Sequence, residues 1–299
     1  MSDIFRGLSA FPITPASADG IVDTDAVQML VARLVSAEVA SIGLLGSTGT
    51  YAYLDRTQRR RIVAAAAEVK GEVPLIVGVG ALRTDAAVAL AQDAEELGAD
   101  GLLLAPVSYT PLTKDEAFLH YITVADATAL PLCIYNNPGT TRFTFDIDLL
   151  QRLAAHPRIA AVKMPLPADG DIATDLDRLR AALPEDFVIG YSGDWGISAA
   201  LTAGADAFYS ALGGTLPNLF MALSEAARSQ NAARTAALED RLQPLWSLCR
   251  THGSLRLAYA LSERLGVCAA SLPRPLLPMN DVALAELDRW LAGNGDLAS

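Results

Sequence analysis

Lysine is scarce in this chain of 299 residues. Only three of its 23 basic residues are lysines, at positions 70, 114 and 163. Lys70 ends a helical pattern and Lys114 opens one beside acidic residues, so both are predicted to be solvated surface lysines. Lys163 alone falls inside an apolar run, where an ammonium group is costly to bury.

Cysteine and histidine are also few, and their spacing favours neither a metal nor a redox pair. The cysteines form no C-x-x-C pattern, and the histidines are scattered. Cys133 lies in an apolar run and is predicted to be a core residue. His156 precedes Pro157 at a helix end and is predicted to be a surface cap. We therefore expect no metal ion and no cofactor.

Long apolar runs are absent, and the charge balance is acidic. No run approaches the roughly 20 residues that cross a bilayer. The first residues lack the charged and apolar regions of a signal peptide, which favours the cytoplasm. The formal net charge of -11 argues against nucleic acid and anionic lipid as partners. A local site can still oppose the global charge and bind a small anion.

Short apolar runs alternate with amphipathic runs along most of the chain. Near-continuous apolar strands indicate burial on both faces, which is typical of a parallel sheet covered by helices. Eight strand–helix units favour a (β/α)₈ TIM barrel of class α/β. An open, doubly wound sheet would want a G-x-G-x-x-G after the first strand, and residues 7–12 offer none. The expected strands are 7–14, 41–46, 74–80, 101–107, 132–136, 159–164, 187–192 and 207–212.

The alternation of predicted strands and helices ends at residue 228. The expected barrel helices are 25–38, 55–70, 84–97, 114–127, 147–155, 171–183, 197–203 and 215–228. Helical patterns at 232–251, 254–265 and 281–291 then follow without strands between them. We predict a barrel domain over residues 1–228 and a C-terminal helical extension over residues 229–299. This extension is expected to cover surface or support an oligomer rather than to take part in catalysis.

Reactive groups of such barrels lie at the carboxyl ends of the strands, so Lys163 is the first candidate. Desolvation favours an uncharged lysine amine, which is a nucleophile toward carbonyl carbon. The alternative is a structural ion pair between Lys163 and a buried carboxylate. Tyr135 ends the neighbouring strand and could move protons to and from an imine. Its alternative is a core tyrosine whose hydroxyl binds a backbone carbonyl.

Three turns could hold an anion. Gly46-Ser47-Thr48-Gly49 follows the second strand, and its hydroxyls and amides could hold a small carboxylate. An ordinary strand–helix turn is the alternative. Ser192-Gly193-Asp194 and Gly213-Gly214 follow the last two strands, where many barrels bind phosphate. No arginine or lysine lies close to them in sequence, so a phosphate site there has no support.

Taken together, Gly46-Ser47-Thr48-Gly49, Tyr135-Asn136-x-Pro138, Val162-Lys163 and Ser192-Gly193-Asp194 resemble the dihydrodipicolinate synthase / N-acetylneuraminate lyase family of pyruvate-dependent class I aldolases. The order and spacing match from about Gly7 to beyond Gly214. The resemblance implies a lyase whose Lys163 forms a Schiff base with pyruvate or a related 2-oxo acid. It also implies an aldehyde as second substrate, and a homotetramer.

The resemblance implies roles for further residues. Tyr135 would shuttle protons, Ser47 would relay them, and Thr48 with neighbouring amides would hold the pyruvate carboxylate. Tyr109 would stand for a tyrosine that the family supplies across a subunit interface. The predicted catalytic residues are Lys163, Tyr135 and Ser47, and the predicted substrate-binding residues are Thr48, Gly46, Gly49, Tyr109, Thr140, Arg142 and Tyr209.

Several departures bear on the substrate. Thr50 stands where the family often has glutamate, and Met164 follows the lysine in place of a frequent glutamate. Dihydrodipicolinate synthases carry an arginine where this chain has Thr140, and Arg142 comes two residues later. In the tail, an Asn-Pro stretch leading to a lysine is replaced by residues 252–256. These changes fit a relative acting on another 2-oxo acid, such as a sugar-acid aldolase or dehydratase.

Two alternatives remain open at this point. One is 4-hydroxy-tetrahydrodipicolinate synthase itself, joining pyruvate to aspartate semialdehyde with Arg142 replacing the missing arginine. The other is a non-catalytic barrel that binds a small acid.

Overall fold

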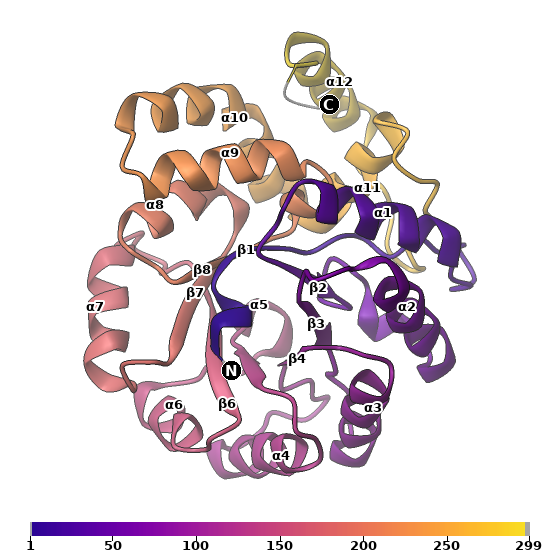
Figure 1. The fold of residues 1–299 in the computed structure, drawn as a ribbon. Coiled ribbons are helices and arrows are strands. Elements are labelled where there is room, and N and C mark those ends of the chain that lie inside the picture. Colours follow the sequence, from indigo (N-terminus) through magenta and orange to yellow (C-terminus); the bar gives the residue numbers. More distant parts are fainter. Residues whose placement is uncertain (1, 297–299) are drawn as a thin grey trace.

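Eight parallel strands close into a barrel in the computed structural model, which describes residues 2–296. Each strand pairs with the next along the chain, and β8 pairs with β1 (Figure 1). The TIM barrel predicted from the alternating pattern is therefore confirmed. The strands are β1 (Gly7–Ala10), β2 (Ser41–Leu44), β3 (Leu75–Gly78), β4 (Gly101–Leu104), β5 (Leu132–Tyr135), β6 (Ile159–Pro165), β7 (Val188–Ser192) and β8 (Ala207–Ser210).

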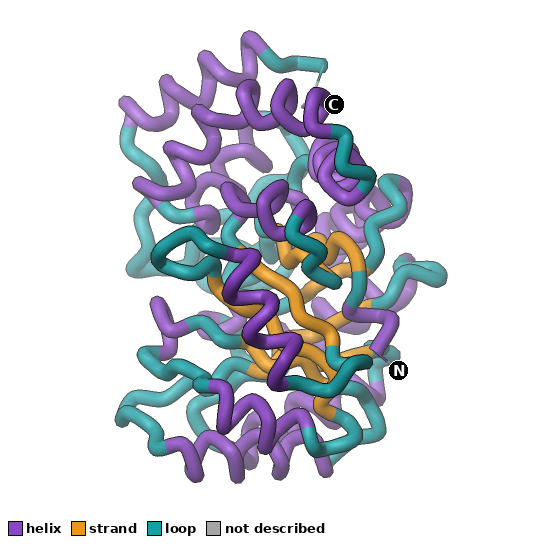
Figure 2. The backbone as a smooth tube through the Cα atoms, turned by 90° about the vertical axis from the view of Figure 1, so that its left-hand side faces the viewer, coloured by secondary structure: helices purple, strands orange, loops and turns teal. Residues whose placement is uncertain are grey.

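Helices surround the barrel on its outside (Figure 2). They are α1 (Thr24–Ser36), α2 (Arg56–Val69), α3 (Thr84–Glu96), α4 (Lys114–Asp126), α6 (Ile147–Ala154), α7 (Ile172–Ala182), α8 (Ile197–Thr202) and α9 (Pro217–Arg228). All eight were predicted, with ends shifted by a few residues. Five short elements were not predicted from the sequence. They are the helix α5 (Pro138–Thr141) and the 3₁₀ turns η1 (Ser2–Phe5), η2 (Tyr51–Tyr53), η3 (Asp194–Gly196) and η4 (Leu212–Gly214).

Side-chain oxygens fix where several helices begin. Asp23, Asp55, Asp146 and Asp171 each accept a hydrogen bond from a backbone N–H in the first turn of the following helix. Such caps satisfy donors that the helix itself leaves open. Thr113 and Glu116 form a reciprocal capping box at the start of α4.

Two apolar layers hold the barrel together. One lies between the strands and the surrounding helices, and the other fills the barrel interior. Phe5 of η1 fills the amino-terminal end of the interior, where the chain begins (Figure 1). The interior side chains are Phe5, Phe11, Ile76, Leu103, Ala105, Cys133, Tyr135, Ala161, Val188, Ala207 and Tyr209. Cys133 is fully buried, as predicted.

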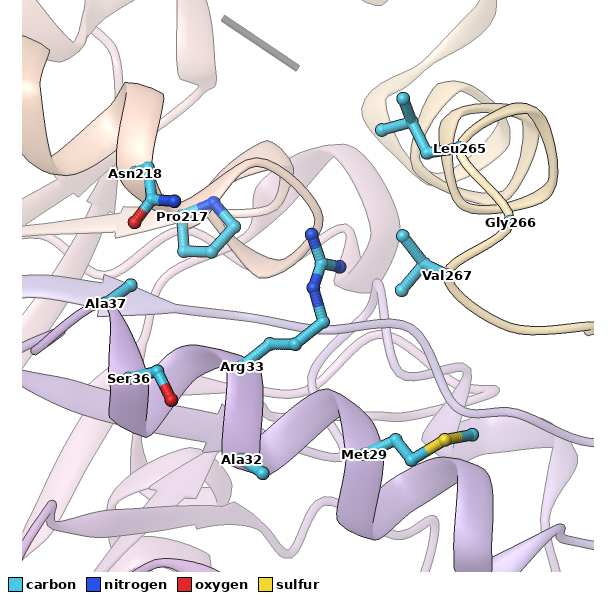
Figure 3. Close-up of a pocket in the computed structure, with 10 residues that line it drawn as sticks. All are labelled: Met29, Ala32, Arg33, Ser36, Ala37, Pro217, Asn218, Leu265, Gly266 and Val267. Carbon is cyan, nitrogen blue, oxygen red and sulfur yellow. The ribbon is translucent and has the colours of Figure 1, made fainter. Parts of the chain in front are cut away.

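The three predicted C-terminal helices are present as α10 (Ala232–His252), α11 (Ser254–Arg264) and α12 (Asp281–Gly293). α10 packs against α9, and α11 contacts η4 after the last strand. The domain boundary at residue 228 stays a prediction. A hollow of about 720 Å³ lies between α1, the start of α9 and the residues after α11 (Figure 3). It holds none of the predicted site residues, so it is a surface feature apart from the candidate site.

Two polar predictions were wrong. Lys70 is mostly covered and forms an ion pair with Asp100, 2.9 Å away, because α2 ends against the segment that enters β4. His156 is also mostly covered: its Nε2 lies 3.1 Å from the Asp126 carboxylate. Lys114 is more than half exposed, as expected, and pairs with Asp146. Among the helices of residues 2–296, none has both the length and the apolar character needed to span a membrane.

Gly43 offers a test of how tightly the interior is packed. A Cβ at this position would lie 2.2 Å from the ring of Phe11. We expect Gly43→Ala to lower the free energy of unfolding by about 1–3 kcal/mol, since overpacking displaces the ring. Urea denaturation measures the change. Gly293→Ala is the control, because nothing lies within 4 Å of its added Cβ. Equal stability of both variants would contradict this account of the interior.

Candidate active site

Lys163 points into the barrel near the carboxyl end of β6. It is 5% exposed and lies in register with Tyr135 on β5 and Gly190 on β7. Met164, the next residue, faces outward and packs in the layer between strands and helices. Because side chains alternate along a strand, a shift of one residue would have put the lysine outside the barrel.

The Lys163 amine lies among aromatic rings rather than carboxylates. Nζ is 4.0 Å from the ring centre of Phe11, 4.3 Å from that of Tyr135 and 5.5 Å from that of Tyr209. Within residues 2–296, the only lysines that form ion pairs are the other two. The geometry therefore does not support the alternative of a structural ion pair.

Asp194 is a buried carboxylate close enough to Lys163 for an electrostatic interaction. Ser210 Oγ donates to it at 2.5 Å and the Leu212 N–H at 3.3 Å. Burial raises the pKa of the Asp194 carboxyl, and these hydrogen bonds oppose that rise. The carboxylate thus occupies donors that a phosphate would need, so a phosphate site in these loops is not favoured.

The Tyr135 hydroxyl contacts two polar side chains. Ser47 Oγ lies 3.2 Å from the Tyr135 hydroxyl, and Asn137 Nδ2 donates to it at 3.1 Å. The hydroxyl therefore faces polar side chains and not a backbone carbonyl, which disfavours the core alternative. Tyr135 and Ser47 come together as predicted. Sequence reasoning did not assign a role to Asn137, although its place beside Tyr135 at the strand end could have suggested one.

The turn after β2 brings Ser47 and Thr48 to the same end of the barrel. Thr50 closes this turn with a left-handed backbone, and its N–H donates to the Ser47 carbonyl at 3.1 Å. The N–H groups of Thr48 and Gly49 form no backbone hydrogen bond within residues 2–296. Free amides in such a turn can hold a carboxylate. Gly46 lacks a side chain where the Phe11 ring approaches, since a Cβ would lie 2.7 Å from it.

Three of the other predicted substrate-binding residues are exposed and lie apart from this cluster, whereas Tyr209 lies beside Lys163. Tyr109 is 97% exposed, and Thr140 and Arg142 lie exposed around α5 at the rim. Tyr209 is buried on β8, and its hydroxyl lies 3.5 Å from Cys133 Sγ, on the side of Lys163 away from the strand ends. Burial raises the pKa of Tyr209 well above its usual value. This chain alone therefore brings together Lys163, Tyr135, Ser47 and the Gly46–Gly49 turn.

Comparison with known proteins places this geometry in a family. The sequence matches the Dihydrodipicolinate synthetase family over residues 4–293. It is 34% identical to 4-hydroxy-tetrahydrodipicolinate synthase 1 of Streptomyces coelicolor, covering 98% of this chain and 94% of that protein. The synthase of Gluconacetobacter diazotrophicus is 30% identical, with 98% of each chain covered.

Solved structures agree with the sequence relatives. The crystal structure of dihydrodipicolinate synthase from Agrobacterium tumefaciens matches with a TM-score of 0.96 and 53% identity, covering 100% of this chain and 99% of that one. This chain is a lyase of the pyruvate-dependent, Schiff-base-forming type, which uses a lysine of the protein and no external cofactor. It belongs to the Dihydrodipicolinate synthetase family.

Proposed function

We propose that Lys163 is the amine that forms the Schiff base. The observation that carries this assignment is a buried Nζ, 4.3 Å from the ring centre of Tyr135, that forms no ion pair within residues 2–296. Nζ attacks C2 of pyruvate, and the carbonyl oxygen leaves as water. The protonated imine then draws electrons from C3, so that loss of a C3 proton gives an enamine. The enamine adds to an aldehyde carbon, or forms by the reverse cleavage.

Tyr135 and Ser47 supply the proton transfers in this proposal. The oxygen on C2 can leave as water only after it gains protons. Tyr135 and Lys163 are register partners at the carboxyl ends of β5 and β6, so we assign this proton transfer to the Tyr135 hydroxyl. Ser47, 3.2 Å away, passes the proton onward. Asn137 donates to the Tyr135 oxygen and so fixes the direction of its hydroxyl. The amides of Thr48 and Gly49 hold the carboxylate, and Tyr209 forms the floor.

The aldehyde partner is proposed to carry a negative charge. Arg142 is exposed at the end of α5, the short helix that follows β5, and forms no ion pair within residues 2–296. A free guanidinium at that position suits a carboxylate. The curated relatives named 4-hydroxy-tetrahydrodipicolinate synthase favour aspartate semialdehyde as one candidate. Thr140 favours a different aldehyde acid, because it stands where those enzymes are expected to have arginine.

Tyr109 is proposed to act across a subunit interface. An aromatic side chain that is 97% exposed at the rim suits burial against a second copy of the chain. We propose that the protein is a homotetramer in the cytoplasm. Assembly varies among relatives, since a similar structure at 26% identity is described as a monomeric dihydrodipicolinate synthase variant.

Borohydride trapping tests the role of Lys163. Reduction in the presence of pyruvate should leave a stable adduct on the peptide that contains Lys163, because the imine becomes a secondary amine. Lys163→Ala should abolish the adduct and lower turnover at least about 10³-fold. Lys114→Ala, at an exposed lysine, is the matched control and should behave like the wild type. An adduct on another residue would overturn the assignment.

Tyr135→Phe tests the proton transfer. We expect kcat to fall by about 10²–10⁴-fold, because the ring still packs but no hydroxyl moves protons. Stopped-flow measurement of imine formation locates the slow step. Tyr53→Phe, at an exposed tyrosine, serves as the control. Unchanged imine formation and turnover in Tyr135→Phe would exclude Tyr135 as the proton donor.

Arg142→Ala tests the charge of the aldehyde. We expect KM to rise about tenfold or more for aldehyde acids and to stay constant for uncharged aldehydes, since only the former lose a charge-assisted hydrogen bond. A panel that includes aspartate semialdehyde, assayed with pyruvate, identifies the preferred partner. Equal effects on charged and uncharged aldehydes would rule out a role of Arg142 in holding the carboxylate.

A further inference from the structure

Helix α11 of the C-terminal region directs two polar side chains toward the loops at the carboxyl end of the barrel. Ser262 Oγ lies 3.4 Å from the Thr215 hydroxyl after β8. Tyr259 donates its hydroxyl to the backbone carbonyl of Thr14 at 3.2 Å. Buried polar contacts of this kind fix the relative positions of the segments that they join.

The contact of Tyr259 continues directly to the turn that follows β2. Thr14 is 3% exposed, and its hydroxyl donates to the Gly49 carbonyl at 2.7 Å. Thr14 therefore joins Tyr259 to Gly49, the last residue of the Gly46–Gly49 turn.

The turn needs such support. Thr50 is a β-branched residue at φ 53°, a left-handed conformation that L-residues other than asparagine and aspartate rarely adopt. A backbone of this kind persists only where the surroundings fix it. Thr50 is 4% exposed, and Tyr259 reaches Gly49, the residue before it, through Thr14. Losing the bond between Tyr259 and Thr14 would loosen the turn next to this strained residue.

Burial raises the pKa of Tyr259 to about 12. The hydroxyl therefore keeps its proton at neutral pH, and the bond to Thr14 is present across the working range. No titration is needed for this contact to hold, so its effect should not depend on pH below that value.

We propose that Tyr259 is a positioning residue that holds the Gly46–Gly49 turn in its carboxylate-binding shape, so that α11 sets the affinity for the 2-oxo acid. This inference rests on the proposed role of the turn. The expected effect of Tyr259 is on binding of the carboxylate and not on proton transfer, because its contacts reach Gly49 through Thr14, whereas the hydroxyl of Tyr135 is held by Ser47 and Asn137.

Tyr259→Phe keeps the ring and removes the hydrogen bond to the Thr14 carbonyl. We expect the pyruvate concentration for half-maximal borohydride trapping on Lys163 to rise about three- to tenfold, as the loss of one hydrogen bond implies. KM should rise in parallel, while kcat stays within about twofold.

Methyl pyruvate separates carboxylate binding from general damage. It has the same ketone without the negative charge, so its trapping should be equally efficient in the wild type and in Tyr259→Phe. Ser262→Ala is the matched control, because it removes a buried hydroxyl from the same helix that contacts Thr215 instead of the turn. It should leave both ligands unaffected.

The outcomes are distinguishable. Failure of the wild type to form any adduct would remove the proposed function and this inference with it. Normal trapping in the wild type with an unchanged pyruvate dependence in Tyr259→Phe would overturn the inference alone. Parallel losses for pyruvate and methyl pyruvate, or the same loss in Ser262→Ala, would show that α11 only stabilises the fold and would also overturn it.

Discussion

The burial of one lysine amine among aromatic rings, with no ion pair to it within residues 2–296, is the constraint on which the site depends. Lys163 Nζ lies over aromatic faces, with Phe11 at 4.0 Å and Tyr135 at 4.3 Å. Ring faces attract a cation, yet they take no proton from it and form no covalent or ionic bond that must be broken before reaction. A carboxylate in the same place would have held the amine as a charged pair. The aromatic interior of the barrel therefore keeps the amine available to a carbonyl.

The same constraint bears on the surroundings of Asp194. It is the buried carboxylate that interacts with Lys163, and it accepts hydrogen bonds from the Ser210 hydroxyl and the Leu212 N–H. These hydrogen bonds oppose the rise in the Asp194 pKa that burial causes, and so they weaken the demand of the carboxylate for a proton. The C-terminal region reaches the same end of the barrel, where Tyr259 of α11 donates its hydroxyl to the Thr14 carbonyl. The prediction that this region only covers surface or supports an oligomer omitted that contact.

Local patterns were enough to predict the barrel and its reactive centre. Each strand is a short apolar run, and Lys163 and Tyr135 stand at the ends of neighbouring runs, so parallel pairing brings them together. The contacts of Tyr259 with Thr14 and of Ser262 with Thr215 join segments far apart in sequence, and no periodic pattern marks them. Lys70 was misjudged for the same reason, because its partner Asp100 belongs to another strand–helix unit.

These contacts give a physical explanation for one departure from the family pattern, the threonine at position 50. Thr50, which stands where a glutamate is frequent, cannot carry the charge of that residue. The Thr14 hydroxyl holds the neighbouring Gly49 carbonyl, and the uncharged phenol of Tyr259 on α11 holds the Thr14 carbonyl. An acidic residue at position 50 would place a negative charge beside amides meant for a carboxylate unless a cation balanced it. The neutral contacts around the turn therefore suit an uncharged residue at position 50, and substrate affinity in this chain depends on residues that lie outside the catalytic cluster.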